Sequence, residues 1–95
     1  MDITIFFGRK LAELTGMYEY GCIGLIKLSI QDAGKDQAHL SYQEMYDVIS
    51  VHLPKRLQRL QINDVAEVAA QLLVILREQR SLFKVDSFAT TTKLG

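Results

Sequence analysis

The hydrophobic residues of this chain recur at intervals of three and four positions over most of its length, which is the spacing of one face of a helix. The N-terminal stretch carries such a face, made by Ile3, Phe7, Leu11 and Leu14. Asp2 is placed to cap the start of this helix, and Gly16 is placed to end it in a left-handed conformation. The pattern therefore predicts a first helix over residues 2–16.

The stretch YEYGCIGLIKLSIQDAG, residues 18–34, is the most apolar part of the chain. Its uninterrupted apolar run is about ten residues long and contains Lys27, whereas a helix needs about twenty to cross a bilayer. At 100° per residue, its polar side chains fall on one narrow strip, formed by Tyr20, Lys27 and Gln31. A helix with so thin a polar strip is covered on most sides, so we expect this segment to be the central helix of a water-soluble fold.

A polar loop over residues 34–41 precedes a third helical pattern. Ser41 and Glu44 have the spacing of a capping box, and an apolar face follows, made by Tyr42, Met45, Tyr46, Ile49 and Leu53. Pro54 interrupts the pattern, but Leu57 and Leu60 continue the same face. Proline removes a backbone donor and is tolerated in the first turn of a helix, so we expect a kink or a tight restart at this position.

The last helix has the clearest pattern, with an apolar face made by Val65, Val68, Leu72, Ile75 and Leu76. Asn63 or Asp64 is expected to cap it, with Glu67 completing a capping box on Asp64. Beyond it, the alternation around Phe83 and Val85 suggests a short strand. We therefore expect one helical domain over residues 1–83 and a partly mobile tail over residues 84–95. The fold class predicted is all-α, an irregular bundle of four to five helices.

The composition fits a single small folded domain. The chain has 95 residues, of which 48% are hydrophobic, and its 11 basic residues balance 11 acidic ones. Such a chain has no overall field that attracts nucleic acid or an anionic membrane. One cysteine cannot form an internal disulfide, and small secreted domains usually contain several. These features favour a cytoplasmic protein with no membrane segment, and the N-terminus shows no targeting pattern.

The residues that could take part in catalysis or metal binding lack partner residues at a suitable spacing. His39 lies in the polar loop, and His52 lies five residues from Asp47, on a different side of the same helix. Cys22 has apolar neighbours, which is typical of a buried and inert thiol. No glycine-rich phosphate loop is present. We therefore expect no catalytic residues, no metal and no cofactor.

The segment PKRLQRL carries the one local cluster of positive charge. Lys55, Arg56 and Arg59 lie on one side of the predicted helix, away from its leucines. They are candidates for contact with an acidic protein surface. The same cluster can also hold DNA phosphates, which would make the protein a transcriptional regulator. The simplest interpretation remains an ordinary solvated helix face.

Several apolar side chains fall outside the predicted inward faces. Phe6, Val48 and Val51 are the candidates for contact with a second chain. Exposed apolar surface of this extent usually marks an interface, and a two-fold homodimer is the commonest assembly. The leading hypothesis is therefore a non-enzymatic, homodimeric protein with a regulatory or adaptor role. The alternatives are the DNA-binding regulator and a helical module that binds a small ligand between tyrosines.

Overall fold

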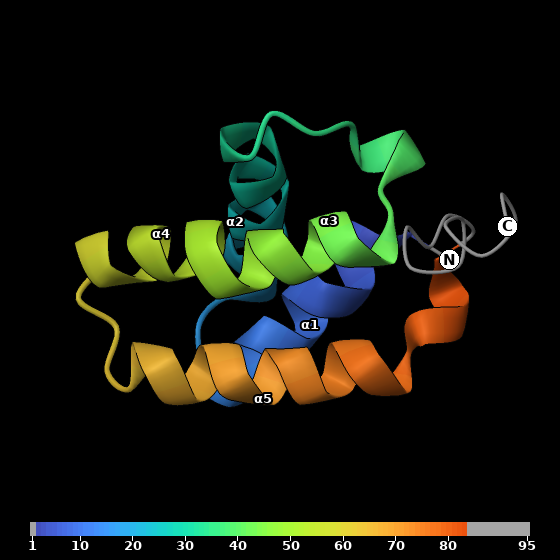
Figure 1. Cartoon of the computed structure of the whole chain (residues 1–95). Helices are drawn as coiled ribbons and strands as arrows, with labels where there is room; N and C mark the ends of the chain where they lie inside the picture. Colours follow the sequence, from blue (N-terminus) through green and yellow to red (C-terminus); the bar gives the residue numbers. More distant parts are fainter. Residues whose placement is uncertain (1, 84–95) are drawn as a thin grey trace, which may run out of the picture.

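The computed structural model describes residues 2–83, and every regular element in this range is helical. The elements are α1 (Ile3–Thr15), α2 (Glu19–Asp32), η1 (Gln37–His39), α3 (Tyr42–Asp47), η2 (Val48–His52), α4 (Leu53–Arg59), α5 (Val65–Glu78) and η3 (Arg80–Leu82). Because α3, η2 and α4 follow one another without a break, the described chain consists of four main helices (Figure 1). The all-α prediction is confirmed. The tail over residues 84–95, with the strand suggested around Val85, lies outside the described residues.

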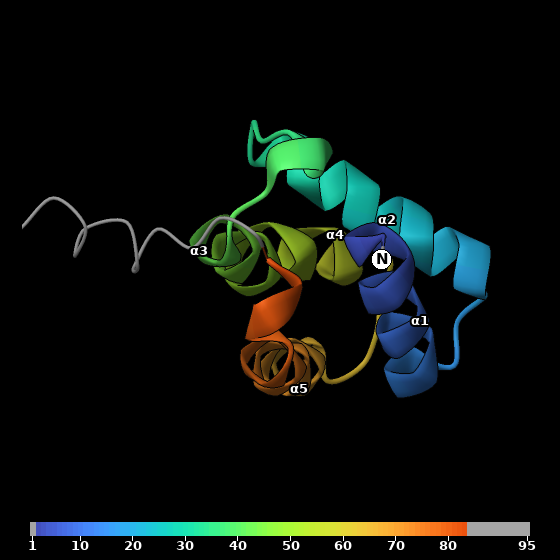
Figure 2. The same cartoon turned by 90° about the vertical axis from the view of Figure 1, so that its right-hand side faces the viewer.

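Both predicted ends of α1 are confirmed. The Asp2 carboxylate accepts a hydrogen bond from the backbone N–H of Thr4 at 2.9 Å, and Gly16 ends the helix with φ 75°. Within α1, a Cβ added at Gly8 would stand 2.4 Å from Cγ1 and 2.6 Å from Cα of Ile23. The missing side chain therefore allows α1 and α2 to pack in direct backbone contact, and they form the helical pair beside the long helix (Figure 2).

The central helix is the one formed by residues 42–59, and the prediction that α2 holds this place is wrong. In Figure 2 the 42–59 helix lies between α2 and α5, with α1 beside it. Its inward side chains are completely buried: Met45, Val48, Ile49, Leu53 and Leu57. In α2 the buried set is Cys22, Ile26, Ser29 and Ile30, whereas Leu28 is 40% exposed. Apolar composition alone did not indicate that α2 has one covered side and one open side.

A π-helical turn, η2, allows the central helix to keep one face inward. Met45, Ile49, Leu53 and Leu57 recur at every fourth residue, and on a regular α-helix such a stripe rotates by about 40° per step. The wider π turn offsets part of this rotation, since its residues close i→i+5 hydrogen bonds. The Leu53 N–H accordingly donates to the Val48 carbonyl.

Pro54 lies directly after this turn, at the start of α4. The prediction of a kink or a tight restart is confirmed, because the chain continues into α4 with no intervening loop. Proline lacks the N–H that an α-helical bond to Ser50 would require. The hydroxyl of Ser50 donates to the Tyr46 carbonyl at 2.8 Å.

The two remaining helix starts differ in their caps. The capping box of α3 is confirmed: the Glu44 N–H donates to Ser41 Oγ at 3.0 Å, and the Ser41 N–H donates to Glu44 Oε1 at 2.9 Å. The capping box predicted on Asp64 is wrong. Asp64 has left-handed dihedral angles, φ 57° and ψ 41°, and its side chain caps nothing. The Glu67 carboxylate accepts from Gln71 Nε2 instead.

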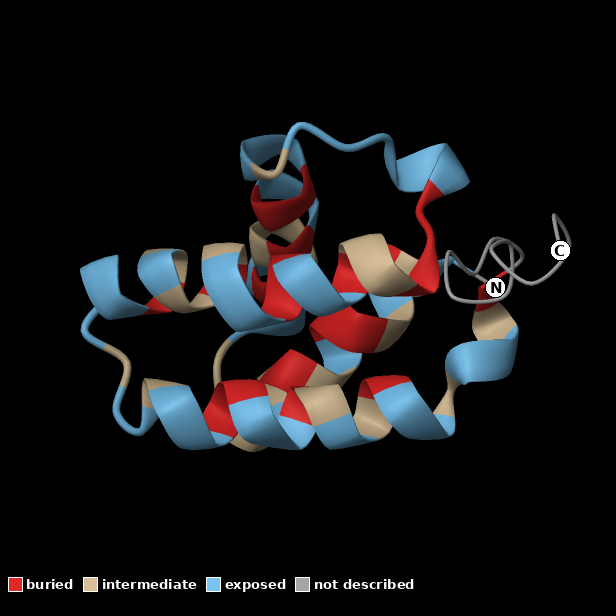
Figure 3. Cartoon of the chain, in the orientation of Figure 1, coloured by how far each residue is buried: buried red, intermediate tan, exposed pale blue. Residues whose placement is uncertain are grey.

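The last described residue, Phe83, packs against the start of the central helix. Its buried ring packs edge-on against Tyr42, with 6.0 Å between the ring centroids. Arg80 lies over the same tyrosine ring, with Cζ 4.6 Å from its centroid. The hydrophobic core is thus continuous from α1 to Phe83, and Figure 3 shows its buried positions on the facing sides of the helices.

Candidate functional site

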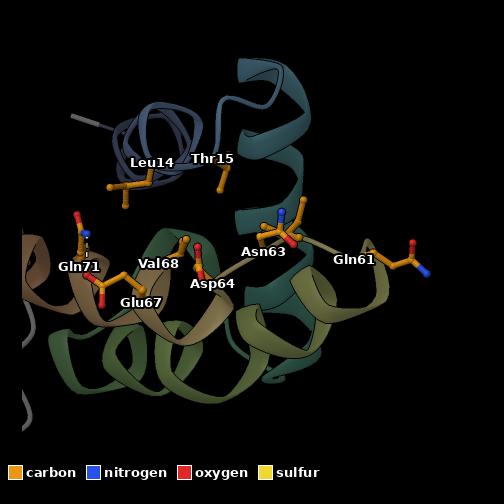
Figure 4. Close-up of a pocket in the computed structure, with 9 residues that line it drawn as sticks. Leu14, Thr15, Gln61, Asn63, Asp64, Glu67, Val68 and Gln71 are labelled. Carbon is orange, nitrogen blue, oxygen red and sulfur yellow. Dashed lines mark hydrogen bonds between the residues drawn. The ribbon is translucent and has the colours of Figure 1, made fainter.

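A hollow of about 380 Å³ lies between the C-terminal end of α1, the α4–α5 loop and the first turns of α5 (Figure 4). Its walls are formed by Leu14, Thr15, Gln61, Ile62, Asn63, Asp64, Glu67, Val68 and Gln71. The loop reaches this shape because Gln61 and Asp64 both take positive φ angles, 59° and 57°. The hollow is open, and polar and apolar groups line it in nearly equal measure.

The groups that line this hollow are not arranged for nucleophilic chemistry. The hydroxyl of Thr15 donates its proton to the Leu11 carbonyl at 2.8 Å, so no base activates it. The Glu67 carboxylate accepts from Gln71 Nε2 at 2.9 Å. Within the described range, no group of three histidine, cysteine, aspartate or glutamate residues is close enough to hold a metal ion. The hollow is therefore a surface recess of mixed polar and apolar lining.

Cys22 is completely buried in the core. Burial raises the pKa of its thiol, and the nearby Glu19 charge raises it further, although a hydrogen bond with Thr15 acts in the opposite direction. The thiolate is the reactive form of cysteine. Burial and a raised pKa both oppose a nucleophilic role for this residue.

The polar groups considered from the sequence serve local structure. His39 Nδ1 lies 2.8 Å from the Asp36 carboxylate on the exposed loop, and this hydrogen bond is the main cause that lowers the pKa of Asp36. Glu44 accepts from the Ser41 N–H, which lowers the pKa of the Glu44 carboxyl. Asp47 accepts from Gln43 Nε2 at 3.2 Å. Each group is engaged with a neighbour in its own element or loop.

One of the three basic residues of the segment PKRLQRL has an ion-pair partner within the chain. Arg56 makes a bidentate ion pair with Asp32 at the end of α2. Its Nε donates to Asp32 Oδ2 at 2.6 Å, and its Nη2 donates to Asp32 Oδ1 at 2.8 Å. This pair lowers the pKa of Asp32 and raises that of Arg56. Lys55 and Arg59 remain exposed on α4. Sequence reasoning missed the Arg56–Asp32 pair because the two residues are far apart in the chain.

The three candidates for contact with a second chain have different positions. Val51 is 46% exposed, and Phe6 is half-buried with its ring 5.1 Å from that of Phe7. Val48 is completely buried, so its assignment to the outer side of the helix is wrong. The π turn at Val48–His52 is the reason, because it changes which positions face the core.

The open side of α2 is wider and more apolar than the narrow polar strip predicted from the sequence, which included Tyr20. Tyr18 and Tyr20, at the start of the helix, are 72% and 73% exposed, and their rings contact each other at 5.5 Å. One and two turns later, Gly24 and Leu28 lie on the same side as Tyr20.

The tyrosines are not gathered around one cavity. Tyr42 lies in the core against Phe83, whereas Tyr18 and Tyr20 lie at the exposed start of α2. In Figure 2 the start of α2 and the helix α3, which begins at Tyr42, lie on opposite sides of the molecule. The arrangement gives no support to a ligand site between tyrosines.

None of the described helices is both long enough and apolar enough to span a membrane. Comparison with protein-family models, with curated proteins and with solved structures gives no match to this chain.

Proposed function

We propose that this chain is a small non-enzymatic protein that acts as a homodimer through protein–protein contacts, in a regulatory or adaptor role. The observation that supports this proposal is the exposed apolar surface of the described helices. Eight large hydrophobic residues are well exposed there: Ile5, Tyr18, Tyr20, Leu28, Tyr46, Val51, Leu60 and Val74. Three of them, Tyr18, Tyr20 and Leu28, belong to or adjoin α2, and exposed apolar side chains that gather on one face commonly mark an interface.

The polar groups of the chain support a contact role more than a catalytic one. The carboxylates of Asp2 and Glu44 cap helices, and that of Asp32 holds Arg56. A catalytic site needs a nucleophile or an acid–base group with a positioned partner. The proposed compartment is the cytoplasm, because a single buried thiol gives a chain of this size no disulfide to rely on.

Sedimentation equilibrium tests the homodimer. The single chain has a mass of 10.8 kDa, and we expect a reversible two-chain species as the protein concentration rises over about 1 to 300 µM. A single 10.8 kDa species over this whole range, without aggregation, would contradict the proposed function.

A further inference from the structure

We infer that the homodimer forms through the outward side of the 42–59 helix, packed antiparallel against the same helix of a second copy. This inference rests on the proposed function and names the surface that carries it. The surface, called the outer row below, consists of Asp47, Val51, Lys55 and Arg59, all four of which are exposed. In Figure 1 the 42–59 helix lies in front of α1 and α2, and no other described helix crosses in front of it.

The π turn that keeps the buried residues of this helix in line also keeps the outer row in line. The outer row recurs at every fourth position, as do the buried residues Met45, Ile49, Leu53 and Leu57. Each member of the outer row lies two positions after a buried one, which is about 200° around a helix. The four side chains therefore form one row on the side opposite to the core.

The charged members of the outer row have no ion-pair partner within residues 2–83. The Asp47 carboxylate accepts a hydrogen bond from the Gln43 amide at 3.2 Å, which leaves its charge uncompensated. Asp47 and Lys55 are eight positions apart, or about 12 Å along a helix, so they cannot pair with each other in one chain. Both charges are therefore available to a second molecule.

The order of the charges along the outer row identifies the second molecule as another copy of this chain. Val51 lies midway between Asp47 and Lys55, four positions from each. A two-fold axis at Val51 therefore places Asp47 of each copy opposite Lys55 of the other. Two ion pairs then flank a contact between the two valines. Parallel helices would set like charges against each other, so the antiparallel arrangement is the favoured one.

Apolar groups on the same helix add to this contact. Tyr46 and Val51 are two of the well-exposed large hydrophobic residues of the described chain, and tyrosine offers a large, rigid contact area with a polar tip. A single pair of helices buries less than the ~800 Å² per partner of a standard interface. We therefore expect a reversible dimer with a dissociation constant on the order of micromolar.

The open side of α2 lacks this complementarity. Its exposed residues Tyr18, Tyr20 and Leu28 are apolar. The two carboxylates of α2 are both ion-paired with arginines of the same chain, Glu19 with Arg9 and Asp32 with Arg56. Neither is free to select a second copy, and the outer row is therefore the better candidate for the interface.

Exchanging the two charges tests this register by sedimentation equilibrium. Asp47→Lys alone and Lys55→Asp alone should each weaken self-association at least about tenfold, because each sets two pairs of like charges across the axis. An equimolar mixture of the two variants should form a heterodimer about as tight as the wild-type dimer, since opposite charges then face each other at both positions. Lys27→Asp, a matched change at an exposed lysine of α2, should leave association unchanged. Circular dichroism checks that all three variants keep the helical fold.

Cross-linking at the axis gives a second measurement that does not depend on charge. Val51→Cys places one thiol of each copy at the axis, and two cysteines form a disulfide when their Cβ atoms lie about 3.5–4.5 Å apart. The native thiol of Cys22 is buried, so it does not compete. Gln58→Cys is the control, because the two copies of this exposed position would lie roughly 21 Å apart along the helices. In a glutathione redox buffer we expect Val51→Cys to form a covalent dimer at least about tenfold faster than Gln58→Cys.

The outcomes separate the interface from the function. A wild-type dimer that neither Asp47→Lys nor Lys55→Asp weakens, or that Lys27→Asp weakens equally, overturns the outer-row interface and leaves the homodimer in place. The same holds if the mixed charge variants fail to associate, or if Val51→Cys and Gln58→Cys cross-link at equal rates. A wild-type chain that stays monomeric overturns the homodimer itself, and the interface with it.

Discussion

Gly8 and Gly24 lie in adjacent helices and have opposite surroundings. Gly8 faces the backbone of Ile23 within the chain, whereas Gly24 faces open space. Glycine at both positions weakens the helix relative to alanine, but only at Gly8 does the described chain gain a close helix contact in return. The two residues therefore separate the intrinsic cost of glycine from its packing benefit.

Gly8→Ala is expected to destabilise the chain, and Gly24→Ala to stabilise it. A methyl group at Gly8 forces α1 and α2 apart, which costs about 1–3 kcal/mol and outweighs the roughly 1 kcal/mol gained in helix propensity. At Gly24 the ~1 kcal/mol gain stands alone. Urea unfolding at a protein concentration low enough to keep the chain monomeric measures both changes. Equal signs for the two variants would contradict this account.

The Arg56–Asp32 pair gives a pH dependence of stability. The folded chain lowers the pKa of Asp32 through its hydrogen bond with Arg56, so the unfolded chain binds the proton more readily. The stabilisation is therefore complete well above the unfolded pKa of about 3.9, and it is lost as the pH falls through the lower folded pKa.

Asp32→Asn should accordingly be less stable than the wild type at pH 7. The difference between the two should shrink as the pH falls from about 5 to below 3, because protonation removes the same charge from the wild type. Denaturant unfolding at a series of pH values measures it. A difference that is constant across this range would show that the ion pair is not its source.

At the scale of elements, the N-terminal cap of α3 is formed by the side chain of Ser41, whereas no side chain caps α5. Ser41→Ala removes the hydroxyl that accepts from the Glu44 N–H, and we expect a loss of about 1 kcal/mol. Asn63→Ala changes the other candidate cap noted in the sequence, but Asp64 holds the N-cap position of α5. It should stay within about 0.5 kcal/mol of the wild type. Thermal unfolding compares the two variants.

The sequence predicted the elements that depend on near neighbours. The Asp2 cap, the Gly16 stop and the Ser41–Glu44 capping box are formed within three or four residues, so the local pattern is sufficient. The cap of α5 was mispredicted because the preceding loop places Asp64 in a left-handed conformation. That conformation belongs to the path of the α4–α5 loop. The four residues of the capping-box motif do not encode this path.

The position of each helix in the bundle could not be predicted from composition. The apolar content of α2 suggested a central helix, yet the centre is the 42–59 helix, whose inward stripe is kept in line by the π turn. For the same reason, the open side of α2 extends beyond the predicted polar strip to Tyr18 and Leu28. Whether an apolar side is covered depends on which helices pack around it, and this is set by contacts such as Gly8–Ile23 and Arg56–Asp32.

At the scale of the whole molecule, the charge distribution argues against DNA binding. Arg56 is neutralised by Asp32, which leaves Lys55 and Arg59 exposed on α4. Two phosphate contacts give a salt dependence with a slope of only about −1.8, whereas a protein with six to ten contacts loses affinity far more steeply.

We therefore expect no tight complex with duplex DNA at low salt. Fluorescence anisotropy at several salt concentrations tests this, with Lys55→Ala/Arg59→Ala as the comparison. This double variant leaves the Arg56–Asp32 pair in place, so any change reports on the exposed charges alone. Tight binding with a steep salt dependence, lost in the double variant, would favour the regulator hypothesis.

The burial of Cys22 has a practical consequence for studying this molecule. The thiol lies on the inner side of α2, and a modifying reagent reaches it only when that helix detaches from its neighbours. The rate of its alkylation therefore reports how often α2 opens, without any engineered label.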